Sequence, residues 1–342
     1  MPKDHPEILL TGGTGLTGSH TLYRLVKENL KVRALVKPGS NYRERIRTVF
    51  SWYCQEPDSL ISNIDFFEGD LNEIPSLEAA FLGISVVFHI AALVSTKKSD
   101  RDRLFKINAE GTANIVNIAL VKDIKWLGYV SSVATLGPNP EGLTDEDYFW
   151  KASPGKSDYS VSKYAAEQQV RRSIEEGLPA VIINPSFIVG PSMNNSGSVS
   201  VFHAVKKGLP FYVNGLAGYV DARDVAESLW QLYQQKIIGA RYIVSAENLE
   251  TPVFINKVAD ALQVKAPRNE APGFILRTFL LFTRIASLFS GKSSSINSTS
   301  IRMAKNRNRY DNSRLKDLTG LKYHSVDEAI ENTVKHLKMR DH

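Results

Sequence analysis

A glycine-rich turn near the start of the chain constrains the fold more than any other feature. The apolar run Ile8-Leu9-Leu10 leads into Thr11-Gly12-Gly13-Thr14-Gly15-Leu16-Thr17-Gly18, and residues 19–28 follow as an amphipathic helix. Glycines at 12, 15 and 18 permit a tight turn, a close approach of backbone to a pyrophosphate, and close packing of helix on strand. The helix N-terminus also offers unpaired N–H groups to an anion. This context favours a dinucleotide-binding turn over a glycine-rich turn without a ligand.

Short apolar runs alternate with amphipathic stretches from residue 7 to about residue 191, the pattern of βαβ units around a parallel sheet. The six runs are Ile8–Leu10, Val32–Val36, Ile64–Phe67, Val86–Ile90, Leu127–Val130 and Ala180–Ile183. We therefore predict an α/β fold, a Rossmann-type doubly wound parallel sheet over residues 1–191, to which segments near 219–246 return. Residues 192–342 are expected to form mainly a smaller, mostly helical substrate-binding lobe.

Composition narrows the classes of protein further. The 342 residues are 43% hydrophobic and 23% charged, which suits a globular chain with a full core. Cys54 is the single cysteine, so the sequence predicts no internal disulfide and no cysteine-based metal site. No secretion signal is recognisable, and we expect a cytoplasmic protein. The net charge of +6 is spread without a nucleic-acid motif, so we expect a small anionic ligand and no nucleic-acid partner.

The end of the second strand bears on which dinucleotide is bound. An NAD site usually has an acidic residue there for the ribose diol, but this chain has Lys37. Lys37, with Arg33 or Arg43 nearby, could pair with a 2′-phosphate, so we predict that NADP(H) is preferred, with NAD(H) as the alternative cofactor. The competing interpretation is that Lys37 is an ordinary solvated lysine.

Other predicted cofactor contacts follow the first, third and fourth strands. Thr14 and Leu16 belong to the glycine turn itself. After the third strand, Asp70-Leu71 places a carboxylate within reach of the adenine edge, although Asp70 could equally cap the next helix. After the fourth, the small residues Ala91-Ala92 would let the chain run close beside the cofactor. His89 lies inside an apolar run and is expected to be a core histidine.

A Tyr-x-x-x-Lys pair is the strongest indication of chemistry. Ser157-Asp158 are good N-cap residues for a helix that continues to about residue 176, so Tyr159 and Lys163 share one helical face. An ammonium beside a phenol lowers the phenol's pKa and lets it exchange a proton. Ser131 and Ser132 follow the preceding strand, at the sheet edge where open α/β proteins bind ligands. We predict that a serine hydroxyl at this edge orients a substrate oxygen near Tyr159, and the alternative is that the two serines only cap a loop.

These motifs together resemble the extended short-chain dehydrogenase/reductases, within the NAD-dependent epimerase/dehydratase superfamily, and most closely its dihydroflavonol-4-reductase-like group. The resemblance covers about two-thirds of the chain. It rests on the glycine turn, Asp70-Leu71, residues 107–112, Ser131-Ser132, Tyr159-x-x-x-Lys163, residues 184–191 and residues 220–225.

The resemblance implies roles for individual residues. Tyr159 would be the acid/base, Ser132 would position the substrate oxygen, and Lys163 would hold the nicotinamide ribose. Asn108 would support the site from the preceding helix. The segment of Pro185 and Ile188 would flank the nicotinamide.

Two departures from the family's patterns separate the alternatives. Sugar-nucleotide dehydratases have Thr-Asp-Glu near the serine, whereas Val133-Ala134 follow Ser132 here, which argues against a dehydratase. Lys37 replaces the acidic residue of many epimerases. We therefore favour an NADPH-dependent reduction of a carbonyl over a nucleotide-sugar epimerase, and both over a nucleotide-sensing protein without catalysis.

The partners expected are a small carbonyl or sugar-type substrate and a second copy of the chain. Residues 272–290 are strongly apolar, but Arg277 and Arg284 fall on one helical face and argue against a membrane span. A helix packed on the lobe is the favoured interpretation, and an interfacial anchor or a lid is the alternative.

Overall fold

The computed structural model describes residues 7–137, 139, 142–148, 150, 156–194, 197–272 and 298–340. Its centre is a seven-stranded sheet in the order β11-β7-β5-β4-β1-β2-β3, and every neighbouring pair is parallel. The strands are β1 (Ile8–Thr11), β2 (Val32–Val36), β3 (Ile64–Glu68), β4 (Val86–His89), β5 (Trp126–Val130), β7 (Ala180–Pro185) and β11 (Arg241–Val244). The strand order reverses between β1 and β4, which is where such folds bind a dinucleotide. The predicted Rossmann-type sheet is confirmed.

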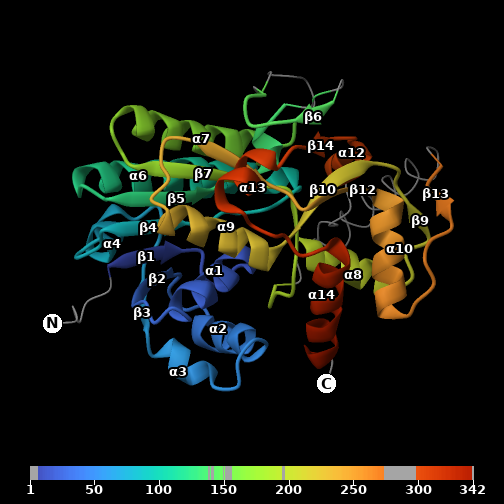
Figure 1. Cartoon of the computed structure of the whole chain (residues 1–342), viewed down its shortest axis with the longest axis horizontal. Coiled ribbons are helices and arrows are strands. Elements are labelled where there is room, and N and C mark those ends of the chain that lie inside the picture. Colours follow the sequence, from blue (N-terminus) through green and yellow to red (C-terminus); the bar gives the residue numbers. More distant parts are fainter. Residues whose placement is uncertain are drawn as a thin grey trace.

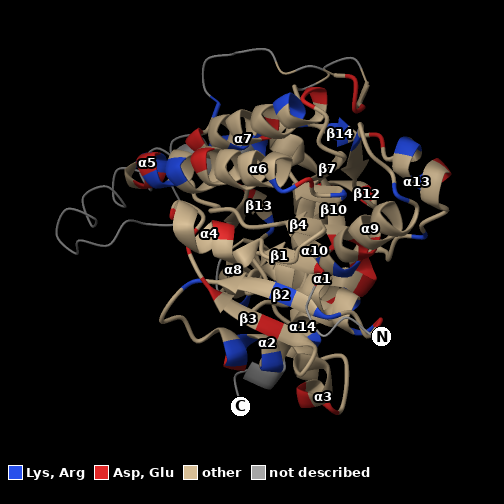
Figure 2. Cartoon of the chain, turned by 90° about the vertical axis from the view of Figure 1, so that its left-hand side faces the viewer, with Lys and Arg blue, Asp and Glu red and all other residues tan. Residues whose placement is uncertain are grey.

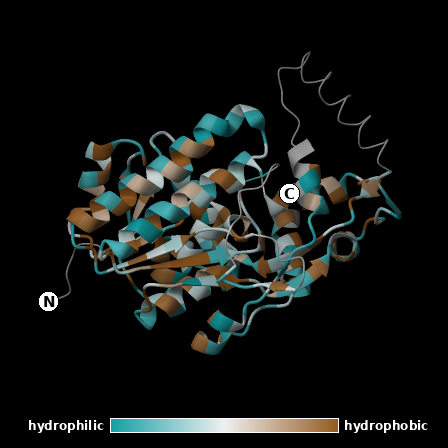
Figure 3. Cartoon of the chain, turned by 90° about the horizontal axis from the view of Figure 1, so that it is seen from above, coloured by the Kyte–Doolittle hydropathy of each residue, from teal (hydrophilic) through white to brown (hydrophobic). Residues whose placement is uncertain are grey.

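Helices cover both faces of this sheet, which explains why its strands are apolar on both sides. Along β1, Ile8 and Leu10 enter one core and Leu9 enters the other. The first core contains residues of α1 (Leu16–Val26), α2 (Tyr42–Ser51), α3 (Pro57–Ile61), α9 (Ala222–Gln234) and α13 (Ser313–Thr319). The second contains residues of α4 (Ile74–Ala80), α6 (Gly111–Val121) and α7 (Asp158–Glu175). Figure 3 shows the apolar strands lying between these helices.

Short irregular elements link β4 to α6 and β5 to α7. They are η1 (Lys98–Asp100), α5 (Arg101–Leu104), the π-helical turn η2 (Phe105–Glu110), η3 (Val133–Thr135) and β6 (Leu143–Thr144). A π-helical turn is rare and is often found at a functional site.

A second lobe lies on the right of Figure 1 and has its own core. Its three-stranded sheet joins β8 (Phe187–Val189), β10 (Leu216–Asp221) and β12 (Glu247–Glu250), and α8 (Ser198–Lys206), α10 (Thr251–Leu262) and α14 (Val326–Arg340) pack on it. Two strand pairs and a helix complete the lobe: β9 (Phe211–Tyr212) with β13 (Asn269–Glu270), β6 with β14 (Arg309–Tyr310), and α12 (Ser298–Lys305). The helical C-terminal region is as predicted, with this small mixed sheet in addition.

Residues 222–244 return to the main sheet as α9 and β11, and α13 packs on the same side through Leu315. Figure 2 shows the positions of basic and acidic residues interspersed along the helices and loops of one side. None of the helices in the described ranges is long and apolar enough to cross a membrane. Apart from Pro272, the apolar stretch 272–290 lies outside the described residues.

Candidate active site

The glycine turn between β1 and α1 has the shape that a pyrophosphate requires. Gly12 has φ +78°, and a Cβ on it would lie 2.6 Å from the amide nitrogen of Ala91. A Cβ on Gly18 would lie 2.0 Å from the carbonyl oxygen of Gly12. Gly15 caps α1 without a side-chain hydrogen bond, and the first turn of α1 contains no acidic residue. The N–H groups of that turn therefore face an anion without competition, and the residues present fit a dinucleotide.

A buried network holds the β1 and β4 ends beside this turn. The Thr11 hydroxyl accepts from the backbone N–H groups of Ile90 and Ala91, both at 3.2 Å, and bonds His89 Nδ1 at 2.8 Å. His89 Nε2 bonds the Thr112 hydroxyl at 3.0 Å. Burial lowers the pKa of His89 to about 3, so the ring is neutral at pH 7. His89 is a satisfied core histidine, as its apolar surroundings predict.

At the far end of the cofactor site, the three predicted cations have different environments. Lys37 and Arg43 are exposed, and the Arg43 guanidinium lies 4.6 Å from the centre of the Phe66 ring. Arg33 instead pairs with Asp65 at 2.7 Å and donates to the carbonyl oxygens at positions 80 and 82. The expectation that Arg33 serves a 2′-phosphate is therefore wrong for this structure, because its donors are engaged at β3 and the end of α4.

The remaining predicted cofactor residues line the strand ends. Asp70 is half-buried, and its carboxylate accepts from the backbone N–H of Asn72 at 2.9 Å, which closes a turn rather than capping α4. Leu71 is buried against Gly111. Thr14, Leu16 and Ala91 are half-buried, and Ala92 is exposed.

The structure brings Tyr159 and Ser132 together. Ser157 caps α7 by accepting from the backbone N–H of Ser160 at 3.0 Å, which places Tyr159 in the first turn. Tyr159 is half-buried, and the Ser132 side chain lies near it just beyond β5. Burial raises the pKa of Tyr159, and the neighbouring Ser132 hydroxyl opposes that rise. A phenol and a serine hydroxyl thus meet at the carboxyl edge of the sheet.

Lys163 does not have the contact that its spacing predicts. Its ammonium donates to the Tyr129 hydroxyl at 2.7 Å and to the Val130 carbonyl oxygen at 2.8 Å. The expectation that Lys163 lowers the pKa of Tyr159 is therefore not met in this structure, since the ammonium is held by β5. Lys163 is 1% exposed, and burial lowers its pKa to about 7 against the opposing charge of Glu167.

Asn108 lies in the π-helical turn and ties the β4 loop to α7. Its amide oxygen accepts from the backbone N–H of Leu93 at 2.7 Å. Its amide nitrogen donates to the Leu93 carbonyl oxygen and to the Ser162 hydroxyl, both at 3.0 Å. Ser162 in turn donates to the Tyr159 carbonyl oxygen at 2.9 Å. Asn108 is thus connected to the first turn of α7 and to the loop beside the glycine turn.

Pro185 ends β7 and is buried, and Ile188 is half-buried on β8. The side chain of Asn184, one residue before Pro185, donates to the Ser132 carbonyl oxygen at 3.1 Å. Between them, Phe187 is exposed and packs edge-on against Tyr219, with ring centres 5.7 Å apart. Both rings belong to the sheet of the second lobe, so this contact lies within that lobe.

Sequence reasoning missed two residues that contact this constellation. Tyr129 was read only as part of a strand, yet it carries the hydroxyl that holds Lys163. Glu167 was read as part of a helix, yet it is buried and accepts from several elements. A charged residue four positions after Lys163, on the same face, was the available indication.

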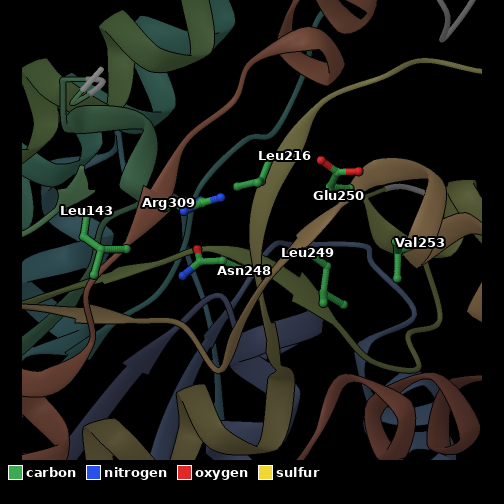
Figure 4. A pocket seen from close by; sticks show the side chains of 7 residues that line it. All are labelled: Leu143, Leu216, Asn248, Leu249, Glu250, Val253 and Arg309. Carbon is green, nitrogen blue, oxygen red and sulfur yellow. The ribbon is translucent and has the colours of Figure 1, made fainter. Parts of the chain in front are cut away.

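A groove of about 650 Å³ lies elsewhere on the second lobe (Figure 4). Arg309 and the exposed Leu143 lie on one side of it in Figure 4, and Val253 lies on the other. Its lining is Leu143, Leu216, Asn248, Leu249, Glu250, Val253 and Arg309. None of these is a predicted site residue, so the groove does not bear on the reaction.

Comparisons with known proteins agree with this geometry. Residues 8–244 match the model of the NAD dependent epimerase/dehydratase family. A Synechocystis protein that carries the provisional name dihydroflavonol 4-reductase is 30% identical, over 95% of this chain and 92% of its own. The sterol demethylase protein B of Methylococcus capsulatus is 26% identical, over 97% and 98%. The crystal structure of gox2253 superposes with a TM-score of 0.79 at 27% identity, covering 98% of this chain and 99% of that one.

Proposed function

Because the chain belongs to the NAD-dependent epimerase/dehydratase family, we propose that it is an NADPH-dependent carbonyl reductase in which Tyr159 is the acid/base. It is an NAD(P)-dependent oxidoreductase of the extended short-chain type. The observation that carries the proposal is the proximity of Tyr159 to Ser132 at the carboxyl edge of the sheet.

The cofactor and the two hydroxyl groups have separate roles in the reduction. The bound cofactor supplies a hydride. The hydroxyls of Ser132 and Tyr159 converge on the substrate oxygen, and Tyr159 gives its proton to that oxygen as negative charge develops there. Burial raises the pKa of Tyr159, which keeps the phenol protonated at neutral pH. A protonated donor suits reduction better than oxidation.

The preference for NADP(H) is part of the proposal. Lys37 and Arg43 are exposed cations at the β2 end, where an acidic residue would repel a 2′-phosphate. We expect Lys37→Asp to weaken NADPH binding by about tenfold to a hundredfold and to leave NADH binding nearly unchanged. Lys27→Asp, at the far end of α1, is the matched control and should change neither. Calorimetric titration at moderate salt measures both cofactors, and equal wild-type affinities would remove the preference.

The proposed substrate is a carbonyl compound with an apolar or aromatic body. Support comes from the exposed ring of Phe187 beside Pro185 and from the name of the Synechocystis relative. A nucleotide-sugar epimerase is the alternative, since the family includes such enzymes. The reductase and the epimerase differ in their net use of cofactor. A reductase consumes NADPH, whereas an epimerase leaves its cofactor unchanged overall. Net consumption of NADPH with a carbonyl substrate would decide for the reductase.

Tyr159→Phe is the central test. It removes the proton donor and keeps the ring, so cofactor binding should persist while kcat falls by about a thousandfold. Tyr164→Phe is the matched control on the same helix, because its ring packs against Trp150 and not against Ser132. A Tyr159→Phe variant that turns over at the wild-type rate would contradict the assignment, and an inactive wild type with bound nucleotide would favour a sensor.

A homodimer and a cytoplasmic location stay predictions of the sequence. Light scattering of the purified chain and fractionation of its cells would test them.

A further inference from the structure

Glu167 is a buried carboxylate to which three polar side chains of the reaction edge are hydrogen-bonded. It lies on α7, one turn beyond Lys163, and is 1% exposed. One of its oxygens accepts from the hydroxyl of Ser131 at 2.6 Å, from the hydroxyl of Thr135 at 2.7 Å and from the amide of Asn184 at 2.9 Å. These three residues belong to the β5 end, η3 and β7.

The other carboxylate oxygen faces two guanidinium groups. Arg241 of β11 donates to it at 3.1 Å, and Arg171, one turn further along α7, donates at 3.1 and 3.2 Å. Burial favours the neutral acid, but the bonds from Ser131 and Thr135 and the charges of the two arginines outweigh it, so the pKa of Glu167 lies below its usual value. Glu167 is therefore a fixed negative charge inside the protein.

Each uncharged donor to Glu167 adjoins a predicted part of the reaction site. Ser131 immediately precedes Ser132, and Asn184 immediately precedes Pro185. The Thr135 hydroxyl, which donates its single proton to the Glu167 carboxylate, also lies 2.8 Å from the Ser132 carbonyl oxygen. Removing the carboxylate would leave the buried Ser131 hydroxyl without its acceptor and would take one acceptor each from Thr135 and Asn184, which lets both segments shift.

Glu167 also acts on Lys163 through charge. The groups that surround the Lys163 ammonium are the Tyr129 hydroxyl and Val130 carbonyl of β5 and the neutral His89 ring of β4, which stacks on Tyr129. None of these supplies a full negative charge. Burial favours the uncharged amine, and the attraction to Glu167 opposes that effect.

We propose that Glu167 is a positioning residue that aligns the Ser132 and Pro185 segments and supplies a buried negative charge one helical turn from Lys163. This inference rests on the proposed function, because the role that the family resemblance implies for Lys163, holding the nicotinamide ribose, requires the charge of its ammonium. Glu167 reaches the reaction only through its neighbours, and the test must separate that role from a contribution to stability alone.

The decisive variant is Glu167→Gln, which keeps size and shape and removes the charge. The N–H groups of the glutamine amide would also face the hydrogen-bond donors that now bond the carboxylate. The resulting shift of the Ser132 and Pro185 segments should lower kcat at least tenfold. The alkaline limb of the kcat/KM profile, where Lys163 loses its proton, should move to lower pH by about one unit. The pH dependence of the NADPH dissociation constant, measured by tryptophan fluorescence, should move by the same amount without any turnover.

Glu176→Gln is the matched control. It is the same substitution at the end of the same helix, where the carboxylate is exposed and pairs with Arg172 at 2.8 Å. It should leave both pH profiles within error. Glu167→Asp restores the charge at a shorter reach, so it should lower kcat and leave the alkaline limb in place. Glu167→Asp also decides the matter if Glu167→Gln does not fold, since a shifted limb in it would contradict the proposal.

The outcomes separate this inference from the proposed function. If Glu167→Gln lowers only the melting temperature and leaves both pH profiles unchanged, Glu167 is merely structural and the inference fails while the reductase stands. If no carbonyl consumes NADPH, the proposed function fails, and the binding profile still decides whether Glu167 controls the charge of Lys163.

Discussion

At the scale of single residues, Asn108 shows how one amide fixes the reaction edge. It exchanges two hydrogen bonds with the backbone of Leu93 and gives a third to Ser162, one residue before Lys163. Asn108 is 1% exposed, so no solvent can replace these bonds. The amide therefore sets the distance between the loop after β4, which is predicted to lie beside the cofactor, and α7, which carries Tyr159.

We predict that Asn108→Ala lowers the free energy of unfolding by about 3 kcal/mol, because it leaves two backbone groups of Leu93 unpaired and removes the bond that the Ser162 hydroxyl accepts. The loss of alignment should also lower kcat at least tenfold. Urea denaturation and steady-state kinetics measure the two effects. Asn117→Ala on α6 is the control, since Asn117 bonds only the exposed Arg172 and should cost less than about 0.5 kcal/mol. If Asn108→Ala unfolds with the same free energy as the wild type, the hydrogen bonds of Asn108 are not needed to hold the β4 loop to α7.

The residue scale is also where the sequence is least informative. The i, i+4 spacing correctly places Tyr159 and Lys163 on one helix, but it does not determine where a long side chain ends. Lys163 turns to β5 because Tyr129 and a strand carbonyl offer it acceptors, and these come from a different part of the chain. Arg33 turns away for the same reason, toward Asp65 on the neighbouring strand. Such choices depend on tertiary contacts that a local pattern does not contain.

At the scale of elements, the entry of α1 depends on Gly18 more than on its neighbour Gly13. A Cβ on Gly18 would overlap the Gly12 carbonyl oxygen, which is backbone and has little room to move. A Cβ on Gly13 would first meet the end of the Leu10 side chain at 3.2 Å, which can shift. The two glycines therefore differ in what a methyl group would displace.

We predict that Gly18→Ala lowers the free energy of unfolding by about 2–3 kcal/mol and weakens NADPH binding at least tenfold, because α1 must move away from the glycine turn. Gly13→Ala should stay within about 1 kcal/mol of the wild type and keep its affinity. Thermal unfolding with and without NADPH reports both quantities. Equal behaviour of the two variants would mean that the turn tolerates displacement of the helix.

Elements were predicted well where their pattern is local. All six predicted apolar runs became strands of the main sheet, because a strand buried on both faces must be apolar throughout. The seventh strand, β11, is a short run after an irregular segment, and only its pairing with β7 makes it part of the sheet. The sheet of the second lobe is harder still, since β8, β10 and β12 are distant in sequence and each is short.

At the scale of the whole molecule, the C-terminal helix α14 joins the second lobe to the nucleotide side. His336 of α14 is buried and stacks on Trp52, with ring centres 5.1 Å apart and planes 21° from parallel. Tyr53, the next residue, bonds His20 of α1 at 2.9 Å and accepts from Asn332 of α14 at 3.3 Å. Two buried histidines thus lie at this contact, His336 on α14 and His20 on α1, the helix that follows the glycine turn.

This contact predicts how stability depends on pH. Burial, with the nearby charges of Lys335 and Arg223, lowers the pKa of His336 to about 4, below the unfolded value of about 6.5. The folded state therefore binds fewer protons than the unfolded state in that window. The contribution of His336 to stability is present above pH 6.5 and is lost as pH falls toward 4, by at most about 1.4 kcal/mol per pH unit.

We predict that His336→Phe, which keeps the stack on Trp52 and cannot be protonated, flattens the fall of unfolding free energy between pH 6.5 and 4. His324 is the contrasting case, because its hydrogen bond to Asp224 raises its pKa, so its stabilisation is present at low pH and is lost as pH rises. His324→Asn should therefore make the unfolding free energy fall more steeply as the pH drops, since it removes stability that the wild type has at low pH. Urea unfolding at pH 7, 6 and 5 distinguishes the two. If both variants keep the wild-type slope, acid does not act through the contact between the lobes.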